Sequence, residues 1–172
     1  PRGEENQPAV WNGLATGTGA LTVGKIYIGH NSSAGGSGAP AGAGTVTLTA
    51  GTVTASSGGN GTINYATIVG DQNPGTLTVD GAGTTYTTNG MTVGYGDDLA
   101  QSATFNLTNG AKVTVNGGRN LAIGETAGGG VGIPGQVDIQ GGTLKIGGIL
   151  QVGLAAPYSS YTQTGGAASS DN

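Results

Sequence analysis

The sequence predicts an all-β fold: a parallel β-solenoid of about five coils, with three short strands in each coil. Abundant glycine, scarce charge and short alternating runs that recur along the chain lead to this prediction. Glycine contributes 38 of the 172 residues, and charged residues only 8%, whereas charged residues make up about 25% of a typical globular chain. The glycines follow no collagen period, so we assign them to turns. Threonine, valine and isoleucine in the alternating runs favour strands.

The repeated unit has a first alternating run, a tight turn and usually a second run. Five segments show this pattern, and they start at Thr45, Thr76, Thr104, Gln136 and Ser160. Their sequences are TVTLTAGTVTAS, TLTVDGAGTTYTT, TFNLTNGAKVTV, QVDIQGGTLKIGG and SYTQTGGAASS. A third run ends in glycine at Gly29, Gly70, Gly94, Gly124 and Gly153. The anchors Val46, Leu77, Phe105, Val137 and Tyr161 lie 31, 28, 32 and 24 residues apart. Units of this length cannot bury an apolar face alone, so they are expected to stack.

Alternation within the runs assigns the side chains that face the core, because neighbouring strand residues point to opposite faces. For the fourth coil the inward residues are Phe105, Leu107, Val113, Val115, Leu121 and Ile123. For the fifth they are Val137, Ile139, Leu144, Ile146, Leu150 and Val152. Like residues should stack about 4.8 Å apart from coil to coil.

The turn after each third run varies most in length. It extends from the five residues Asp71–Gly75 to the fifteen residues His30–Gly44. Insertions that enter at one corner of every coil lie along one edge of a solenoid. We therefore expect a binding function, if there is one, at this edge.

Two adjacent stretches, GTLTVDGAGTTYTTNGMTVGYG and TFNLTNGAKVTVNGG, resemble the β-helical passenger repeats of bacterial autotransporters and related secreted repeat proteins. Those units commonly read G-T-L-T-V-x-G-x-G-S-x-W-x, then a strand ending in V-G, then a unit with N-G-G. Here Thr84 or Thr85 stands in the serine position and Tyr86 in the tryptophan position. The resemblance covers about Leu14–Gly166. It implies secretion and a right-handed β-helix, and such repeats occur in adhesins and matrix components.

The composition argues against nucleic-acid binding, a membrane-spanning helix and cysteine-based sites. Net charge is −4 and the five basic residues are scattered, whereas nucleic-acid binding needs a basic face. No apolar run approaches the roughly 18 residues of a membrane-spanning helix. Cysteine is absent, so neither a disulfide framework nor a thiolate metal site is expected.

The strongest carboxylate pair is Asp97–Asp98 in GYGDDLAQS. It could bind calcium, or supply a general acid and base for cleaving a polysaccharide. Glu125 follows Gly124 at the same corner one coil away, so a cation held by Asp97, Asp98 and Glu125 is one hypothesis. Adjacent loop residues seldom converge on one ligand, and a polar turn is the simpler interpretation.

The remaining candidates have simpler structural interpretations. His30 opens a Gly/Ser/Ala-rich loop and is expected to be a solvated loop residue. Trp11 is expected to cover the end of the apolar core, with sugar stacking as the alternative. One outward column should read Thr47, Thr78, Asn106, Asp138 and Thr162, and the next Thr49, Asp80, Thr108, Gln140 and Thr164. A uniform threonine array would favour ice binding, but aspartate and amides interrupt both columns.

The two ends complete the prediction. Residues 1–12 are expected to form a polar arm or cap, 13–166 the solenoid, and 167–172 a tail or open end. Near the C-terminus, Ala168 and Ser170 replace the large apolar residues of the previous coil. The chain is then either a fragment of a longer repeat protein or a subunit whose open end receives a neighbour. An assembly interface would involve Trp11, Tyr161, Gln163 and Thr164.

We therefore expect a non-enzymatic, structural or adhesive protein outside the cell. Self-association through the solenoid ends is the expected partnership, with surface glycans as further partners and calcium as the one cofactor to consider. The alternatives are a β-helix that binds or cleaves polysaccharide at its loop edge, and an ice-binding solenoid.

Overall fold

The computed structural model describes residues 9–13, 19–30, 42–57, 65–96, 101–116, 120–126 and 130–171, with only the backbone of 9–13. These residues form strands and contain no helix. The strands before residue 90 are β1 (Ala9–Gly13), β2 (Ala20–Val23), β3 (Ile26–Ile28), β4 (Gly44–Leu48), β5 (Gly51–Ala55), β6 (Thr67–Asp71), β7 (Gly75–Asp80) and β8 (Thr84–Thr88). The later strands are β9 (Met91–Tyr95), β10 (Ala103–Thr108), β11 (Lys112–Val115), β12 (Leu121–Glu125), β13 (Gly135–Ile146), β14 (Leu150–Val152) and β15 (Ser160–Ser170).

Every ladder between these strands is parallel and joins a strand to its equivalent in the next coil. The smaller sheet has the order β14-β12-β9-β6-β3. The larger sheet has the order β1-β4-β7-β10-β13-β11-β8-β5-β2, and β15 pairs with β13. The first part of β13 pairs with β10 and its second part with β11, so this strand continues around a corner and joins two faces. The predicted parallel β-solenoid is confirmed.

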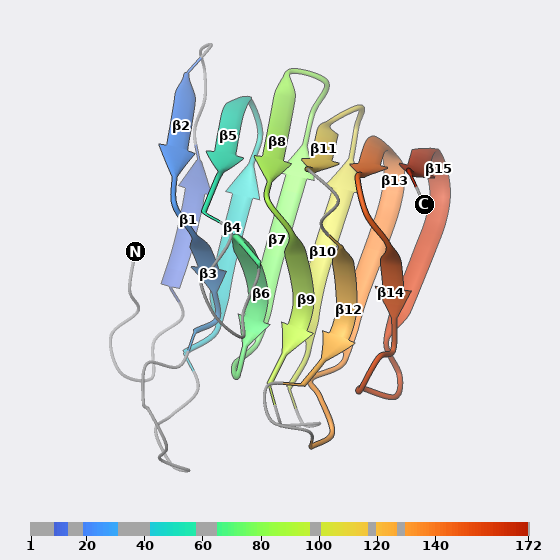
Figure 1. Ribbon diagram of the computed structural model, residues 1–172. Helices are drawn as coiled ribbons and strands as arrows, with labels where there is room; N and C mark the ends of the chain where they lie inside the picture. Colours follow the sequence, from blue (N-terminus) through green and yellow to red (C-terminus); the bar gives the residue numbers. More distant parts are fainter. Residues whose placement is uncertain are drawn as a thin grey trace.

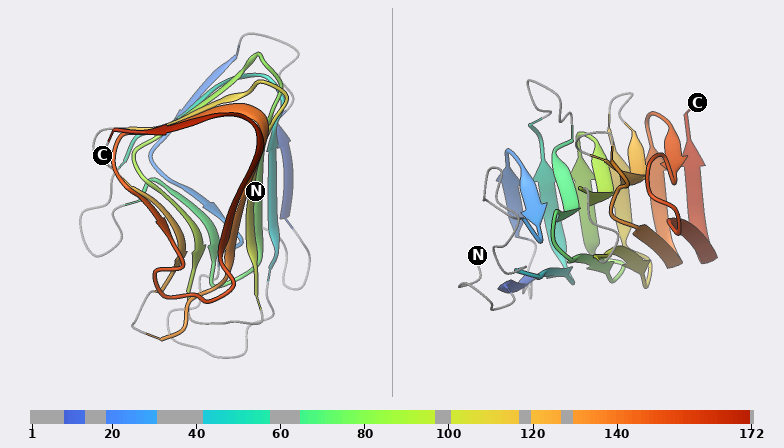
Figure 2. Two further views of the ribbon diagram at one scale, coloured as in Figure 1. Left: turned by 90° about the vertical axis from the view of Figure 1, so that its right-hand side faces the viewer. Right: turned by 90° about the horizontal axis from the view of Figure 1, so that it is seen from below.

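The coils form a right-handed solenoid with three sides. In Figure 1, β7 and β10 run upward behind β8 and β9, which run downward, while the coils advance from β1 towards β15. Figure 2 shows the three faces end-on as a triangle. The smaller sheet makes four turns from β3 to β14, slightly fewer than the predicted count of about five coils, and β15 begins a further turn.

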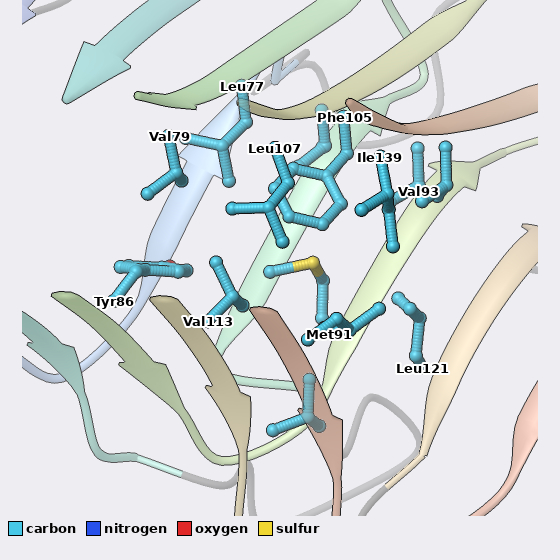
Figure 3. Packing of buried hydrophobic residues seen from close by; sticks show 14 of the residues in the cluster. Leu77, Val79, Tyr86, Met91, Val93, Phe105, Leu107, Val113, Leu121 and Ile139 are labelled. Carbon is cyan, nitrogen blue, oxygen red and sulfur yellow. The ribbon is translucent and has the colours of Figure 1, made fainter. Parts of the chain in front are cut away.

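The core lies inside the triangle, where the three faces meet. Leu77, Phe105, Met91, Val113 and Leu121 come from different strands and point towards one another (Figure 3). The inward residues predicted for the fourth coil are all buried, as are Val137, Ile139, Leu144 and Ile146 of the fifth. Burying a large apolar side chain contributes about 1.5–3 kcal/mol, so the stacked columns are the main source of stability.

The last strand of the smaller sheet departs from this pattern. Leu150 is half-buried and Val152 is 45% exposed, although both continue predicted core columns. β14 is the edge strand of its sheet, so no strand stacks over these side chains within the described residues. Core orientation was predictable from alternation, whereas burial depends on a neighbouring coil.

Strand pairing reaches beyond the limits expected for the solenoid. β1 begins at Ala9, within the predicted arm, and pairs with β4 from Ala9 to Gly13. At the other end β15 continues to Ser170, within the predicted tail, and pairs with β13 up to that residue.

The corner after the smaller sheet carries the most variable connections, as expected. Only residues 72–74 separate β6 from β7, whereas residues 29–43 separate β3 from β4. The glycine that ends each third run has a positive φ, from 69° to 82° across the five coils. Residues with side chains rarely adopt this conformation, which explains why glycine recurs at this position. A second long connection, residues 56–66, lies at another corner, between β5 and β6.

Candidate functional site

The loop-bearing corner brings ionisable side chains into one column. His30, Asp71, Tyr95 and Glu125 each follow the positive-φ glycine of successive coils. The register pairs Asp71 with Tyr95 and Tyr95 with Glu125. The fold thus aligns residues that lie far apart in the sequence, and it does so at the edge where we expected function.

His30 and Asp71 form a close pair in this column. His30 Nδ1 lies 2.5 Å from Asp71 Oδ2, and His30 also forms an antiparallel bridge with Gln72. The side chain of His30 is 44% exposed and that of Asp71 only 6%. His30 is exposed, as expected for a solvated residue, but its ring is also held by a buried carboxylate, which the sequence did not predict. Nothing in the local sequence signals this pair, whose members are 41 residues apart.

Burial sets the electrostatics of the two carboxyl groups. Desolvation raises the pKa of Asp71, and the nearby His30 opposes part of this rise. Desolvation also raises the pKa of Glu125, against a hydrogen bond from Tyr65 that lowers it. Burial, together with the Glu125 charge, raises the pKa of Tyr65. The corner therefore contains two carboxyl groups that are harder to ionise than usual, each beside a different partner.

The proposed cation site is divided between described and undescribed residues. Asp97 and Asp98 lie outside the described residues, so their convergence with Glu125 stays a prediction. Glu125 Oε2 is buried and has no hydrogen-bond partner among the described residues. Within the described part of the chain, no group of three histidine, cysteine or acidic residues could hold a metal ion.

The C-terminal face of the solenoid is the second candidate. Tyr161 is half-buried against the core, and its hydroxyl donates to Gln163 Oε1 over 3.1 Å. Gln163 is exposed and its amide donates to the Gly166 carbonyl over 3.3 Å. Thr164 is exposed and lies at a register shift, because Gln163 pairs with Ile139 and Gly165 with Gln140. Three of the four predicted assembly residues thus lie on this last strand.

Trp11, the fourth, belongs to the opposite end. Its backbone pairs with Val46 at the start of the predicted column of anchors. Its side chain lies outside the described residues, so its role in covering the core stays a prediction.

The two outward columns predicted for the first face have different outcomes. The register confirms the column Thr47, Thr78, Asn106, Asp138 and Thr162. In the second column, the register confirms that Asp80 and Thr108 are neighbours, but the predicted positions of Gln140 and Thr164 are wrong. Thr108 pairs with Gly141 rather than Gln140, because a bulge shifts the register where β13 turns the corner. Asp80 instead accepts hydrogen bonds from Thr108 and Asn109, each at 2.7 Å, and these bonds tie two coils together.

No protein-family model, curated protein or solved structure matches the chain. The described residues include no helix long and apolar enough to cross a membrane. Inference about function therefore depends on the geometry of the loop-bearing corner and of the C-terminal face.

Proposed function

We propose that this protein is a non-enzymatic structural or adhesive solenoid that acts outside the cell and associates end to end. The observation that carries the proposal is the edge of β15, an eleven-residue strand that pairs only with β13 in the described structure. An unpaired strand edge is a template for another chain. Natural sheets usually protect such edges with charge, proline or a covering segment.

The edge strands of both ends lack the first two of these protections. None of the sequences SYTQTGGAASS, LQV, ALTV and IYI, which form β15, β14, β2 and β3, contains a charged residue or a proline. Two such surfaces would experience little electrostatic repulsion on approach. The low overall charge favours stacking in the same way.

The two ends also complement each other in register. The column Leu21, Val53, Tyr86, Val113, Leu144 and Ala168 begins with a large residue and ends with a small one. Leu21 is 39% exposed at one end. A second copy that continues the solenoid would bring its Leu21 over Ala168, and its Ile28 over Val152. Burial of Leu21 and Val152, which are 39% and 45% exposed, would drive the association, whereas Ile28 is already buried.

Head-to-tail contact between two different surfaces does not close, so it yields filaments. Filaments suit a structural or adhesive protein, and the extracellular location is inferred from the resemblance to secreted passenger repeats. Catalysis at the loop edge has less support, because the carboxyl group of Asp71 is covered and bound to His30.

The test is the assembly state of the 172-residue chain, measured by sedimentation velocity and electron microscopy over a range of concentrations. Val152→Glu introduces a charge on the C-terminal face, and Val131→Glu is the matched control, because both valines are 45% exposed. We expect ordered polymers from the unmodified chain and from Val131→Glu, and none from Val152→Glu. A chain that stays monomeric at high concentration, or a Val152→Glu variant that still polymerises, would overturn the proposal.

A further inference from the structure

Four side chains of the first two coils form a continuous series that starts before β3 and ends at the loop-bearing corner. The Lys25 ammonium lies 5.9 Å from the centroid of the Tyr27 ring. The Tyr27 and His30 rings have centroids 4.8 Å apart and are tilted by 43°. His30 Nδ1 then contacts Asp71 Oδ2 at 2.5 Å. A cation, an aromatic face and an imidazole are thus held side by side.

Asp71 determines which imidazole nitrogen is available. A carboxylate beside Nδ1 is an acceptor, so it holds the neutral ring in the tautomer with the proton on Nδ1. Nε2 of His30 is then left as a hydrogen-bond acceptor on a side chain that is 44% exposed.

The pair is poorly explained by stability alone. Burying a carboxylate costs several kcal/mol, and its attraction to a partner often no more than offsets that cost. Asp71 is nevertheless only 5% exposed at the end of β6. Its clearest effect is to fix the ring of His30, as buried carboxylates do for histidines that bind or react through the other nitrogen.

Tyr27 supplies the surface between the two polar groups. It is the central residue of β3 and is 40% exposed, whereas Ile28 beside it is buried. An exposed aromatic face binds C–H groups and leaves its hydroxyl in water. Lys25 adds a positive charge, and it forms no ion pair within the described residues.

We propose that Lys25, Tyr27 and His30 bind a hexuronate unit of an acidic polysaccharide. The sugar carboxylate pairs with Lys25, the C–H face of the ring packs on Tyr27, and a sugar hydroxyl donates to His30 Nε2. Asp71 is a positioning residue that acts through His30 and does not contact the sugar. An inorganic anion would use the lysine but neither the aromatic face nor the acceptor nitrogen. The inference depends on the proposed extracellular role only for the source of the polysaccharide.

His30 is the single histidine of the chain, so one imidazole resonance in an NMR spectrum reports on the site. The probe is trigalacturonate, and galactotriose is its neutral counterpart with a hydroxymethyl group in place of each carboxylate. Acetate tests for binding of any carboxylate. We expect trigalacturonate to shift the His30 resonance saturably, and binding of galactotriose to be at least about tenfold weaker, because the charge pair with Lys25 is lost.

Variants locate the binding on the proposed surface. Lys25→Gln and Tyr27→Leu should each weaken trigalacturonate binding by about tenfold or more, whereas Lys112→Gln, an exposed lysine on another face, should leave it unchanged. Asp71→Asn should change the ¹⁵N shifts of the imidazole towards a mixture of tautomers. Amide spectra of each variant check that it folds, and Lys25→Gln provides a test if Asp71→Asn does not fold.

The absence of a saturable shift would overturn the proposal, as would an equal response to acetate or to galactotriose. A response that Lys112→Gln removes and Lys25→Gln keeps would also contradict it. None of these outcomes bears on end-to-end association, which the Val152→Glu experiment measures separately. A chain that binds the trisaccharide but never polymerises would contradict the assembly proposal alone.

Discussion

In the middle of the solenoid Phe105 is fully buried, whereas Tyr161 is only half-buried, although the register places both in one column two coils apart. The smaller sheet shows the same contrast, because Ile123 of β12 is buried and Val152 of β14 is 45% exposed. The strand pairing thus repeats from coil to coil, whereas the burial of equivalent side chains does not. Stability in this fold therefore comes from stacking between coils, and a coil without a neighbour keeps its shape but loses much of its apolar burial.

The largest expected difference is between Phe105→Ala and Tyr161→Ala. Removing a buried phenylalanine ring leaves a cavity and should lower the free energy of unfolding by about 3–5 kcal/mol. Tyr161 is already open to solvent on one side, so its loss should cost about 1 kcal/mol. Urea denaturation at low protein concentration, where association is minimal, measures both. Equal losses would show that the last coil is closed in solution.

The recurrent glycines give the second comparison. Gly94 in a middle coil has φ of 82°, and a Cβ there would overlap the backbone carbonyl oxygen of Ile133. Gly153 in the last coil has a similar φ of 69°, but its Cβ would meet the Ala156 carbonyl oxygen at an ordinary 3.6 Å. Gly153→Ala should therefore cost only the conformational strain, roughly 1–2 kcal/mol.

Gly94→Ala should cost clearly more than Gly153→Ala, because the backbone of the adjacent coil must also move. Thermal unfolding followed by circular dichroism ranks the two variants. If they lower the melting temperature equally, close packing between coils adds nothing to the requirement for glycine.

These contrasts show what the sequence could and could not predict. Alternation and the five terminal glycines identified the strands, the inward residues and the corner with the most variable connections, because each follows from local geometry. The exposure of Val152 could not follow from alternation, since it depends on whether another strand covers it. The register error at Gln140 came from a bulge at the corner of β13, where one residue is passed over in the ladder.

The site was harder to predict for the same reason. Glu125 was recognised as a residue of the functional corner because it follows a terminal glycine. The His30–Asp71 pair joins two coils across residues 29–43, and the sequence does not show that these two side chains meet. The sequence does show that histidine, aspartate, tyrosine and glutamate follow the terminal glycines of successive coils. The strand register shows that the last three of these residues lie next to one another.

Two buried threonines on neighbouring strands provide the third comparison. Thr67 of β6 hydrogen-bonds the hydroxyls of Tyr86 and Thr88, the latter at 2.7 Å. Thr92 of β9 is equally buried, but its hydroxyl has no hydrogen-bond partner in the described part of the chain. Thr67→Val should cost about 1–3 kcal/mol, because the buried hydroxyls of Tyr86 and Thr88 each lose a hydrogen-bond partner.

Thr92→Val should be neutral or stabilising, because a methyl group replaces a polar group that already lacks a partner. Urea denaturation of the two variants, with Tyr86→Phe as a check on the network, measures the difference. A marked loss for Thr92→Val would mean that its hydroxyl has a partner in solution.

The smallest changes in the free energy of unfolding are expected from Asp71→Asn and Asp80→Asn. As the pH changes, these two changes should have opposite signs. Burial raises the pKa of Asp71, so its contribution to stability is complete below the ordinary value of about 3.9 and is lost as the pH rises through the raised pKa. Hydrogen bonds from Thr108 and Asn109 lower the pKa of Asp80. The contribution of Asp80 is therefore present above about pH 3.9 and is lost as the pH falls through the lowered pKa.

Between about pH 3 and pH 6, Asp71→Asn should gain stability relative to the unmodified chain as the pH rises, and Asp80→Asn should lose it. Urea denaturation at each pH measures the two differences, and curves of the same sign would show that burial does not control the ionisation of Asp71.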